Sequence, residues 1–389
     1  MCLSIRRMFL IKNSVITLSG LIILLFQPTA EAKKIFSDTI ISKDTVYQNA
    51  SIDLNSGSFQ IINNATLKIE NSTINGTISA DNTAFFKVTN GKLILKNSMF
   101  NINSVRLPAV PDLPAIYYSI NVLQGSVDID NNKFFTNKDY TVGFLTTNRL
   151  ATTGFKITNN EFHRLHGGIL LRNATHAVIE NNKFDHVSSS NIFLIDSSDH
   201  LIKRNTILFS GNNNVGDGLD ITDSANITIT QNYIASGSCY SMMVLHGKNI
   251  NITDNKILSG ITYAISIAGS IGEKTASDQY LLKLIGNRAT RVAGNENITI
   301  THNYLSQNRF GITTDNTDRL IVKNNLFIQR FADNNARKFW TNNDILIKNT
   351  VNVSWEDNLY KEAYSQDPQG DNSLSGKTVS FPLHGGVIL

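Results

Sequence analysis

The chain alternates apolar and polar residues in short runs, and one local pattern, apolar-x-apolar-x-x-Asn-x-apolar, recurs along much of its length. One copy covers residues 127–134 and another covers residues 227–234. Alternation with a period of two is typical of β-strands, because successive side chains point to opposite faces. The pattern therefore predicts a short strand before each Asn and another after it.

The Asn of this pattern returns at a nearly constant interval. The successive intervals are 28, 22, 23, 27, 23, 48, 22 and 33 residues, which is a period of 22–23 with insertions. A period in this range is typical of a solenoid. The anchoring residues are Asn132, Asn160, Asn182, Asn205, Asn232, Asn255, Asn303, Asn325 and Asn358.

Each anchoring Asn predicts three inward side chains, five and three residues before it and two residues after it. Of these 27 positions, 26 hold apolar or aromatic residues, whereas a chain that is 41% hydrophobic would fill about 11 by chance; His200 is the exception. A second alternating run lies about thirteen residues before each Asn. Two or three short strands per 22-residue turn, with no helical segment between them, predict an all-β chain folded as one parallel β-helix. Equivalent positions of successive coils should then lie about 4.8 Å apart.

Asparagine is unusually frequent, at 48 of 389 residues. An Asn at the same bend of every coil can hydrogen-bond the neighbouring coils and so form a ladder. Asn also tolerates a left-handed backbone, which we expect at such a bend. The many Asn-x-Ser/Thr triplets then follow from the ladder and do not indicate glycosylation.

The ends of the chain differ from the repeats. Residues 1–32 have the basic start, apolar run and small residues of a secretory signal, so we expect a mature chain from about Lys33 that is periplasmic or secreted and has no later membrane span. Residues 33–100 repeat more loosely and predict an N-terminal cap with the first coils. Residues 101–360 predict the regular coils of a single domain, and 361–389 a tail that caps the last coil.

Composition and charge exclude several classes of protein. Charged residues make up only 17% of the chain and good helix formers are scarce, which argues against a helical bundle or coiled coil. The formal charge of +4 falls to +2 without residues 1–32, too little to indicate nucleic-acid binding but compatible with an anionic polymer. Cys239 would be alone in the mature chain, so no intrachain disulfide is expected, and we expect a monomer.

Two adjacent coils carry charge at equivalent positions. Three and four residues after the ladder Asn stand His163 and Arg164 on one coil, and Asp185 and His186 on the next. Stacking should place His163 beside Asp185 and Arg164 beside His186, with His166 close by. A His held by a carboxylate suits a general base, and an Arg can neutralise a substrate carboxylate. A surface ladder of ion pairs would leave the same pattern.

A second candidate lies in the segment 216–220. Asp220 occupies an outward position that holds Leu170, Phe193 and Met243 on other coils, and Asp217 stands three residues earlier. An acid among apolar outward residues can have a perturbed pKa, although both could also be turn or surface aspartates. Further outward or loop residues suited to holding a sugar are Tyr117, Tyr118, Tyr240, Tyr263 and Arg309. The insertions 104–118, 271–295 and 329–343 would wall a groove beside them.

Residues 215–315 resemble the polygalacturonase branch of the pectin-lyase-like right-handed β-helix superfamily. The segment Val215-Gly216-Asp217-Gly218-Leu219-Asp220-Ile221 is similar to that family's Asn-Thr-Asp-Gly-x-Asp-Ile coil and matches Asp217 to one catalytic acid. The resemblance implies a right-handed helix. However, the family's adjacent aspartates are replaced by residues 236–240, Ser-Gly-Ser-Cys-Tyr, and its histidine and Arg/Lys pair are missing. We therefore carry over the fold and not the mechanism.

The first functional hypothesis is an exported enzyme that acts on an acidic, uronate-containing polysaccharide by β-elimination or C5 epimerisation. The catalytic residues would be His163, Arg164, Asp185 and His186, with a tyrosine as the acid. A glycoside hydrolase using Asp217 and Asp220 is the second hypothesis, and a non-catalytic glycan-binding or periplasmic accessory protein is the third. No pattern of metal ligands or cofactor-binding motif is present, and Ca²⁺ held by stacked carboxylates stays an open alternative.

Overall fold

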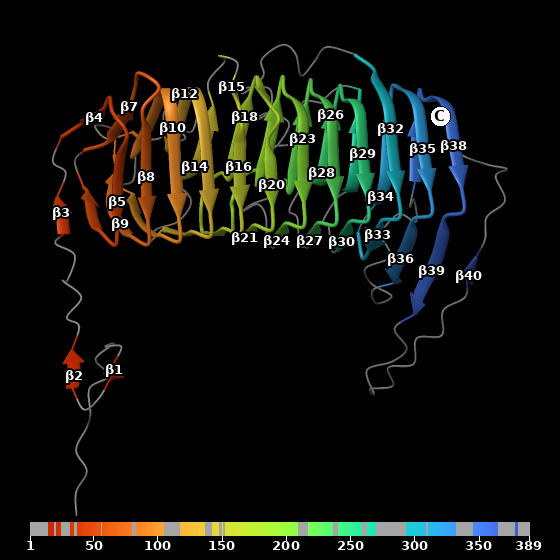
Figure 1. Cartoon of the computed structure of the whole chain (residues 1–389). Helices are drawn as coiled ribbons and strands as arrows, with labels where there is room; N and C mark the ends of the chain where they lie inside the picture. The colour runs from red at the N-terminus through yellow and green to blue at the C-terminus, as the bar shows by residue number, and fades with distance from the viewer. Residues whose placement is uncertain are drawn as a thin grey trace, which may run out of the picture.

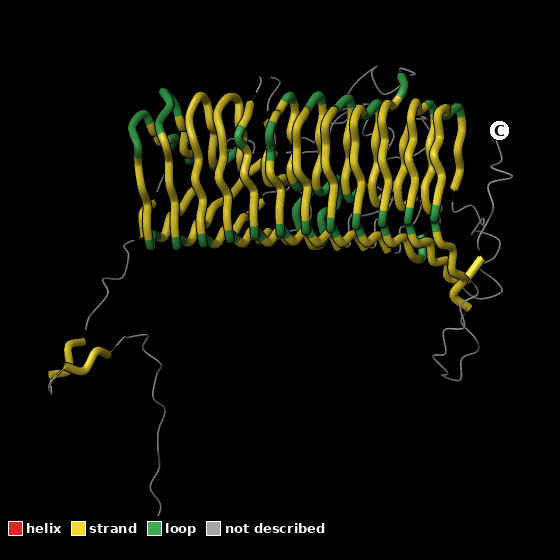
Figure 2. Tube along the Cα trace, turned by 45° about the vertical axis from the view of Figure 1, so that its right-hand side comes forward, coloured by secondary structure: helices red, strands yellow, loops and turns green. Residues whose placement is uncertain are grey.

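The computed structural model shows an elongated stack of β-coils without a helix among its described residues (Figures 1 and 2). Three parallel stacks of strands, here named sheets 1, 2 and 3 in the order in which each coil visits them, enclose one continuous apolar core. No helix in the described part of the chain is long and apolar enough to cross a membrane. The structure describes residues 15–18, 21–24, 32–34, 37–55, 57–79, 83–104, 117–136, 142–147, 150, 152–208, 217–235, 240–258, 263–269, 293–308, 310–331, 345–364 and 378–379.

The strands of each stack pair in parallel, each with the equivalent strand of the next coil. Sheet 1 consists of β4 (Thr39–Ile41), β7 (Phe59–Ile61), the first parts of β10 (Phe86–Lys96) and β12 (Tyr117–Asp130), β14 (Val142–Thr147), β18 (Ile169–Arg172), β22 (Ile192–Ile195), β25 (Leu219–Thr222), β28 (Tyr240–Leu245), β31 (Tyr263–Ala268), β34 (Phe310–Asp315) and β37 (Ile345–Lys348). Sheet 2 consists of β5 (Thr45–Gln48), β8 (Thr66–Glu70), the later parts of β10 and β12, β16 (Phe155–Thr158), β20 (Val178–Glu180), β23 (Ser198–Lys203), β26 (Ala225–Thr230), β29 (Lys248–Thr253), β32 (Asn295–Thr301), β35 (Thr317–Lys323) and β38 (Val351–Glu356).

Sheet 3 follows the ladder Asn of each coil. It consists of β3 (Ala32–Lys34), β6 (Ser51–Leu54), β9 (Thr73–Ile78), β11 (Met99–Ser104), β13 (Lys133–Thr136), β17 (Glu161–His163), β21 (Lys183–Asp185), β24 (Thr206–Leu208), β27 (Tyr233–Ala235), β30 (Lys256–Leu258), β33 (Tyr304–Ser306), β36 (Leu326–Phe331) and β39 (Leu359–Tyr364), with β40 (Thr378–Val379) antiparallel to β39. The short strands β15 (Thr152–Thr153) and β19 (Ala174–Thr175) lie between sheets 1 and 2, and β1 (Val15–Leu18) pairs antiparallel with β2 (Leu21–Leu24).

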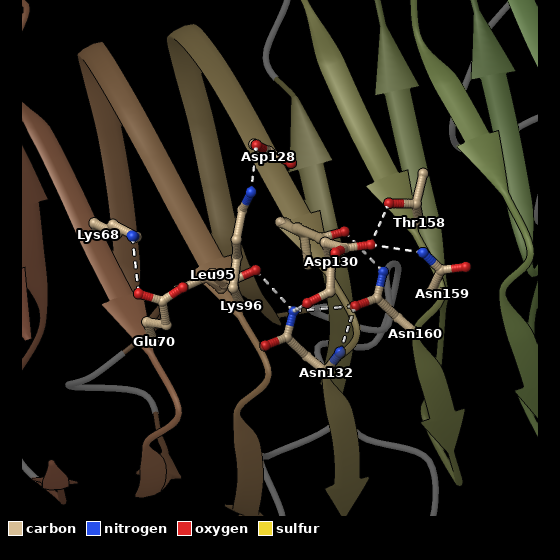
Figure 3. A network of polar contacts seen from close by, with 11 residues as sticks. Lys68, Glu70, Leu95, Lys96, Asp128, Asp130, Asn132, Thr158, Asn159 and Asn160 are labelled. Atoms are coloured by element: carbon tan, nitrogen blue, oxygen red, sulfur yellow. Dashed lines mark hydrogen bonds and ion pairs between the residues drawn. The ribbon is translucent and has the colours of Figure 1, made fainter. Parts of the chain in front are cut away.

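The predicted asparagine ladder is present at the bend between sheets 2 and 3. The side-chain oxygen of Asn160 accepts hydrogen bonds from the backbone N–H of Asn132 at 2.9 Å and from its side-chain amide at 3.1 Å, and the same amide donates to the carbonyl of Leu95 (Figure 3). The same pattern of bonds runs from coil to coil as far as Asn358. Because the ladder asparagines from Asn132 to Asn325 are each 1% exposed, their bonds satisfy groups that water cannot reach.

Two details of the ladder differ from the sequence analysis. The left-handed residue is the one before each ladder Asn, such as Asn131 with a φ of 53° or Arg204 with 54°, and not the ladder Asn itself. The ladder also starts earlier than the Asn repeat, because Ser72 and Ser98 take the same place. The N–H of Ser72 donates to Oγ of Ser98, whose own N–H donates to the side-chain oxygen of Asn132. The looser residues 33–100 therefore already contain regular coils.

The inward positions are buried as predicted along most of the helix. Val127, Ile129 and Phe134, for example, are at most 1% exposed. Phe134 stacks on Phe162 at a centroid distance of 5.2 Å, so equivalent aromatic rings also pack along the axis. On the last coil Val353 is 38% exposed, and most of the tail that we expect to cap this coil lies outside the described residues.

His200, the one polar residue at an inward position, lies neutral in the core. Its Nδ1 accepts the N–H of Ala177 at 2.9 Å, and the side chain is buried, which lowers its pKa from 6.5 to about 4. Between those two pH values the unfolded chain binds a proton that the folded chain does not, so folding stability falls as the pH falls from about 6.5 to 4, by about 3 kcal/mol for this group.

We expect His200→Gln, which keeps an acceptor for Ala177 but does not titrate, to remove this part of the pH dependence. Urea unfolding at pH 7 and pH 4.5 would measure it in both proteins. An equal loss of stability on acidification in the wild type and the variant would contradict the assignment.

Candidate functional site

A cluster of charged side chains lies on the outer face of sheet 3, on two adjacent coils. His163 ends β17 opposite Asp185, which ends β21, and Nδ1 of His163 is 3.5 Å from Oδ2 of Asp185. On the other side of the ring, Nε2 of His163 is 3.4 Å from Oε2 of Glu161. The ring also stacks on Phe135 at 4.9 Å, with 6° between the planes. His163 is therefore fixed between two carboxylates.

His186 contacts the other oxygen of the same aspartate. Its Nδ1 lies 2.6 Å from Oδ1 of Asp185, and half of its side chain is exposed to solvent. A proton on Nδ1 that is donated to Asp185 leaves the lone pair on Nε2, the arrangement of an oriented general base. His163 faces a carboxylate with each ring nitrogen, so His186 is better placed than His163 to take a proton from a substrate.

Arg164 lies at the turn that follows β17. His186 lies at the equivalent turn of the next coil, after β21. Both residues have a left-handed backbone, with φ of 58° and 56°, and the N–H of Arg164 donates to the carbonyl of Asp185 at 3.0 Å. Stacked coils place the two turns about 4.8 Å apart. The Arg164 side chain is exposed, so a positive charge that solvent can reach belongs to the turn next to that of His186.

The cluster is local. Along the same outward column of sheet 3, the coils after Asp185 place Leu208, Ala235, Leu258 and Ser306 at the equivalent position.

Burial acts to raise the pKa of Glu161, but hydrogen bonds with Lys133 and His163 outweigh it and hold this pKa below its usual value. Glu161 is thus ionised at neutral pH.

The turn that leads from this cluster to sheet 1 continues the polar strip. Nδ1 of His166 lies 3.1 Å from Oγ of Ser188, and two residues further along the chain Oγ of Ser190 donates a hydrogen bond to Oδ2 of Asp220. His166 therefore contacts the turn that follows His186. Ser190 of the same turn contacts Asp220, which belongs to the second candidate site predicted from the sequence.

Asp217 and Asp220 form a buried pair on the outer face of sheet 1. Each is 1% exposed, their carboxyl groups are hydrogen-bonded to each other, and Oδ1 of Asp217 accepts the N–H of Tyr240 at 2.8 Å. Asp220 occupies the column of Phe193 and Met243, as predicted. The apolar residues of this outer face form a small cluster of their own, separate from the core of the helix: Leu170, Phe193, Ile195, Met243 and Leu245.

Burial raises the pKa of Asp220 to about 6, against the opposing hydrogen bonds with Asp217 and Ser190. Between the ordinary value of 3.8 and about 6 the folded protein holds a proton that the unfolded chain has lost, so stability falls as the pH rises through this window, by about 3 kcal/mol. We expect Asp220→Asn to abolish that fall, as measured by chemical unfolding at pH 4 and pH 6.5. A variant that keeps the wild-type slope would show that Asp220 does not carry the proton.

The arrangement of this pair does not suit glycoside hydrolysis. A retaining or inverting glycosidase needs two carboxyl groups about 5 Å or more apart, with the scissile bond between them. Two carboxyl groups that hydrogen-bond to each other leave no such space. The geometry therefore favours the His186 cluster over Asp217 and Asp220 as a site of chemistry.

The predicted sugar-binding tyrosines are divided between different places. Tyr240 stacks on Tyr263 at 5.4 Å and Tyr263 on Phe310 at 4.8 Å, forming a row along three coils of sheet 1. Tyr117 packs against the main core, whereas Tyr118 packs against the outer cluster of sheet 1. Arg309 and most of the three insertions expected to wall the groove lie outside the described residues.

A polar pocket of about 550 Å³ lies at the opposite edge of sheet 1, where each coil turns into sheet 2. His246 lines it, with Nδ1 3.0 Å from Oδ1 of Asp223 and Nε2 3.1 Å from the carbonyl of Gly269. This pocket was missed in the sequence, because its residues show no motif and only the stacking of the turns brings them together. Within the described ranges, no three His, Cys, Asp or Glu residues are grouped so that they could hold a metal ion.

Comparison with known proteins agrees with the architecture. Residues 91–257 match the family model of the right-handed β-helix region. No curated protein sequence matches the chain.

Three solved structures with a similar arrangement are distant from this chain in sequence. The periplasmic alginate epimerase AlgG has 14% identity and a TM-score of 0.43, over 82% of this chain and 77% of AlgG. PfbA, a surface adhesin of Streptococcus pneumoniae, has 12% identity and a TM-score of 0.38, over 88% and 90%. The A-module of the mannuronan C-5 epimerase AlgE6 of Azotobacter vinelandii has 9% identity and a TM-score of 0.33, over 83% and 91%. The family match over residues 91–257 and the parallel three-sheet coils together show the parallel β-helix fold that the sequence predicts.

Proposed function

We propose that the protein is an enzyme that removes the C5 proton of a uronate residue in an acidic polysaccharide, leading to β-elimination or C5 epimerisation. The observation that carries this proposal is the 2.6 Å contact between Nδ1 of His186 and Asp185, beside the exposed Arg164. This is a solvent-accessible imidazole oriented by a carboxylate, next to a cation. Both reactions begin with such a base and such a charge.

Each group has a defined task. Nε2 of His186 takes the C5 proton, and Asp185 stabilises the imidazolium that forms. The electrons of the C5–H bond move into the carboxylate of the sugar, and the Arg164 guanidinium neutralises the added charge. A neutral or basic polymer gains nothing from Arg164, which is why we propose an acidic substrate.

The location follows from the proposed signal. Removal of residues 1–32 by a signal peptidase would release a chain that acts in the periplasm or outside the cell, where such polymers occur. Its small net charge does not favour nucleic-acid binding, and we propose that it works as a monomer without a bound cofactor.

The test is incubation of the protein with a panel of polyuronates, followed by three measurements. Elimination gives an unsaturated uronate that absorbs near 230 nm, epimerisation changes the uronate composition without cleavage, and hydrolysis releases reducing ends without absorbance. We expect either elimination or epimerisation. Hydrolysis, or retention of a glycan without any reaction, would refute the proposal and favour a hydrolase or a glycan-binding protein, respectively.

A further inference from the structure

Tyr118 is held in an unusual way on the outer face of sheet 1, because its ring lies over glycines of the next two coils. A Cβ atom on Gly143 would come within 2.4 Å of Cε1 and 2.5 Å of Cδ1 of Tyr118. No side chain larger than hydrogen fits at residue 143 while the ring stays in place. The ring also packs against the outer apolar cluster of sheet 1 that includes Leu170. Contacts with Gly143 and with this cluster therefore fix the position of the ring.

The hydroxyl end of Tyr118 reaches the turn that carries the candidate site. A Cβ atom on Gly167 would lie 3.6 Å from Oη of Tyr118, so the phenol ends beside Gly167. Gly167 directly follows His166 and lies three residues after Arg164. Three residues span at most about 10 Å, so a sugar ring over this turn can contact Arg164 and the Tyr118 hydroxyl together.

We propose that Tyr118 is the proton donor of this site, an inference that rests on the function proposed above. After His186 has taken the C5 proton, elimination breaks the C4–O4 bond, and O4 takes the proton of the Tyr118 hydroxyl. In epimerisation the same proton goes to C5. The phenolate then regains a proton from the His186 imidazolium through water, so the enzyme returns to its starting state and no proton is gained or lost.

The other candidate tyrosines are less suited to this role. Tyr117 packs against the main core, and Tyr240 and Tyr263 belong to the aromatic row that ends at Phe310, several coils further along the axis. Tyr118, in contrast, is half-buried, its ring is fixed against Gly143, and its hydroxyl ends beside Gly167 on the turn that carries Arg164. A preorganised donor of this kind needs no rearrangement during the reaction.

The experiment separates the two proton transfers by working in D₂O. Deuterium that enters C5 of the polymer, followed by NMR, reports proton removal by the base, whereas unsaturated or inverted uronate reports completed turnover. We expect Tyr118→Phe to lower turnover about 100-fold or more while C5 exchange continues. His186→Ala should stop both. Turnover of Tyr118→Phe at the wild-type rate, or an equal loss of exchange and turnover, would overturn the role of Tyr118.

Two glycine variants provide the matched pair. Gly143→Ala must displace the Tyr118 ring and should reproduce the loss of turnover with retained exchange, whereas the Cβ of Gly294→Ala meets only the carbonyl of Asn316 at an ordinary contact distance of 3.5 Å, away from this site, and this variant should turn over normally. Unfolding midpoints confirm that each variant is folded. If wild-type protein neither exchanges C5 protons nor forms product on any polyuronate, the proposed function fails and Tyr118 with it. Wild-type exchange combined with normal turnover of both Tyr118→Phe and Gly143→Ala refutes the Tyr118 assignment alone.

Discussion

His186→Ala is expected to lower the turnover of a uronate polymer by about 100- to 10,000-fold, the usual contribution of a positioned general base. Without the imidazole, no group of this turn takes the C5 proton, because His163 faces Glu161 and Asp185 with its two ring nitrogens. Initial rates of product formation, with KM measured separately, would show whether turnover rather than substrate affinity is lost. Asp185→Asn should also slow the reaction, because it removes the acceptor that orients His186.

His176→Ala is the matched control. His176 is also an exposed histidine with a left-handed backbone, φ 54° against 56° for His186, but it lies at the turn between sheets 1 and 2. The cost of placing alanine in this conformation is therefore the same in both variants. Full activity of His186→Ala, or an equal loss in both variants, would contradict the assignment of the base.

Asn205→Ala is expected to have the largest effect on stability, about 3–5 kcal/mol. The side-chain oxygen of Asn205 accepts from both the backbone N–H and the side-chain amide of Asn182, and its own amide donates to the carbonyl of Ile179 and to Asn232. Alanine leaves two buried donors of Asn182 without an acceptor, and each such group costs about 1–3 kcal/mol. Urea unfolding, with the midpoint and slope compared, measures the change.

Asn251→Ala serves as the control for the ladder. Asn251 also lies within a coil and a strand, but on the half-exposed outer face of sheet 2. Surface substitutions of this kind usually change stability by no more than about 0.5 kcal/mol. Similar losses in Asn205→Ala and Asn251→Ala would show that the ladder contributes no more than any other asparagine.

The regular coils could be predicted from the sequence because their rule is local. A side chain two residues after Asn132 must point inward if the strand alternates, and Phe134 does. The same counting placed His163 opposite Asp185 without a structure, since both stand three residues after a ladder Asn. The ladder serines Ser72 and Ser98 were missed, because Ser can replace Asn in this hydrogen-bonding role without resembling it in sequence.

The details of the candidate site could not be predicted in this way. Stacking predicted that His163 would meet Asp185, but the rotamers and the turn made Asp185 bind His186 at 2.6 Å and left His163 between two acids. Asp217 and Asp220 were proposed from their positions as a candidate site or as turn or surface aspartates, and only the structure shows that both are buried and hydrogen-bonded to each other.

The sequence by itself determined the period, the core positions and the ladder of this β-helix, because each depends on spacing along a single coil. The tertiary structure decided which chemical groups meet, because contacts between coils depend on turn conformation, side-chain rotamers and burial, and none of these follows from spacing. Tyr118 illustrates the difference: its identity is visible in the sequence, but only the packing of three coils places its ring over Gly143 and its hydroxyl beside Gly167.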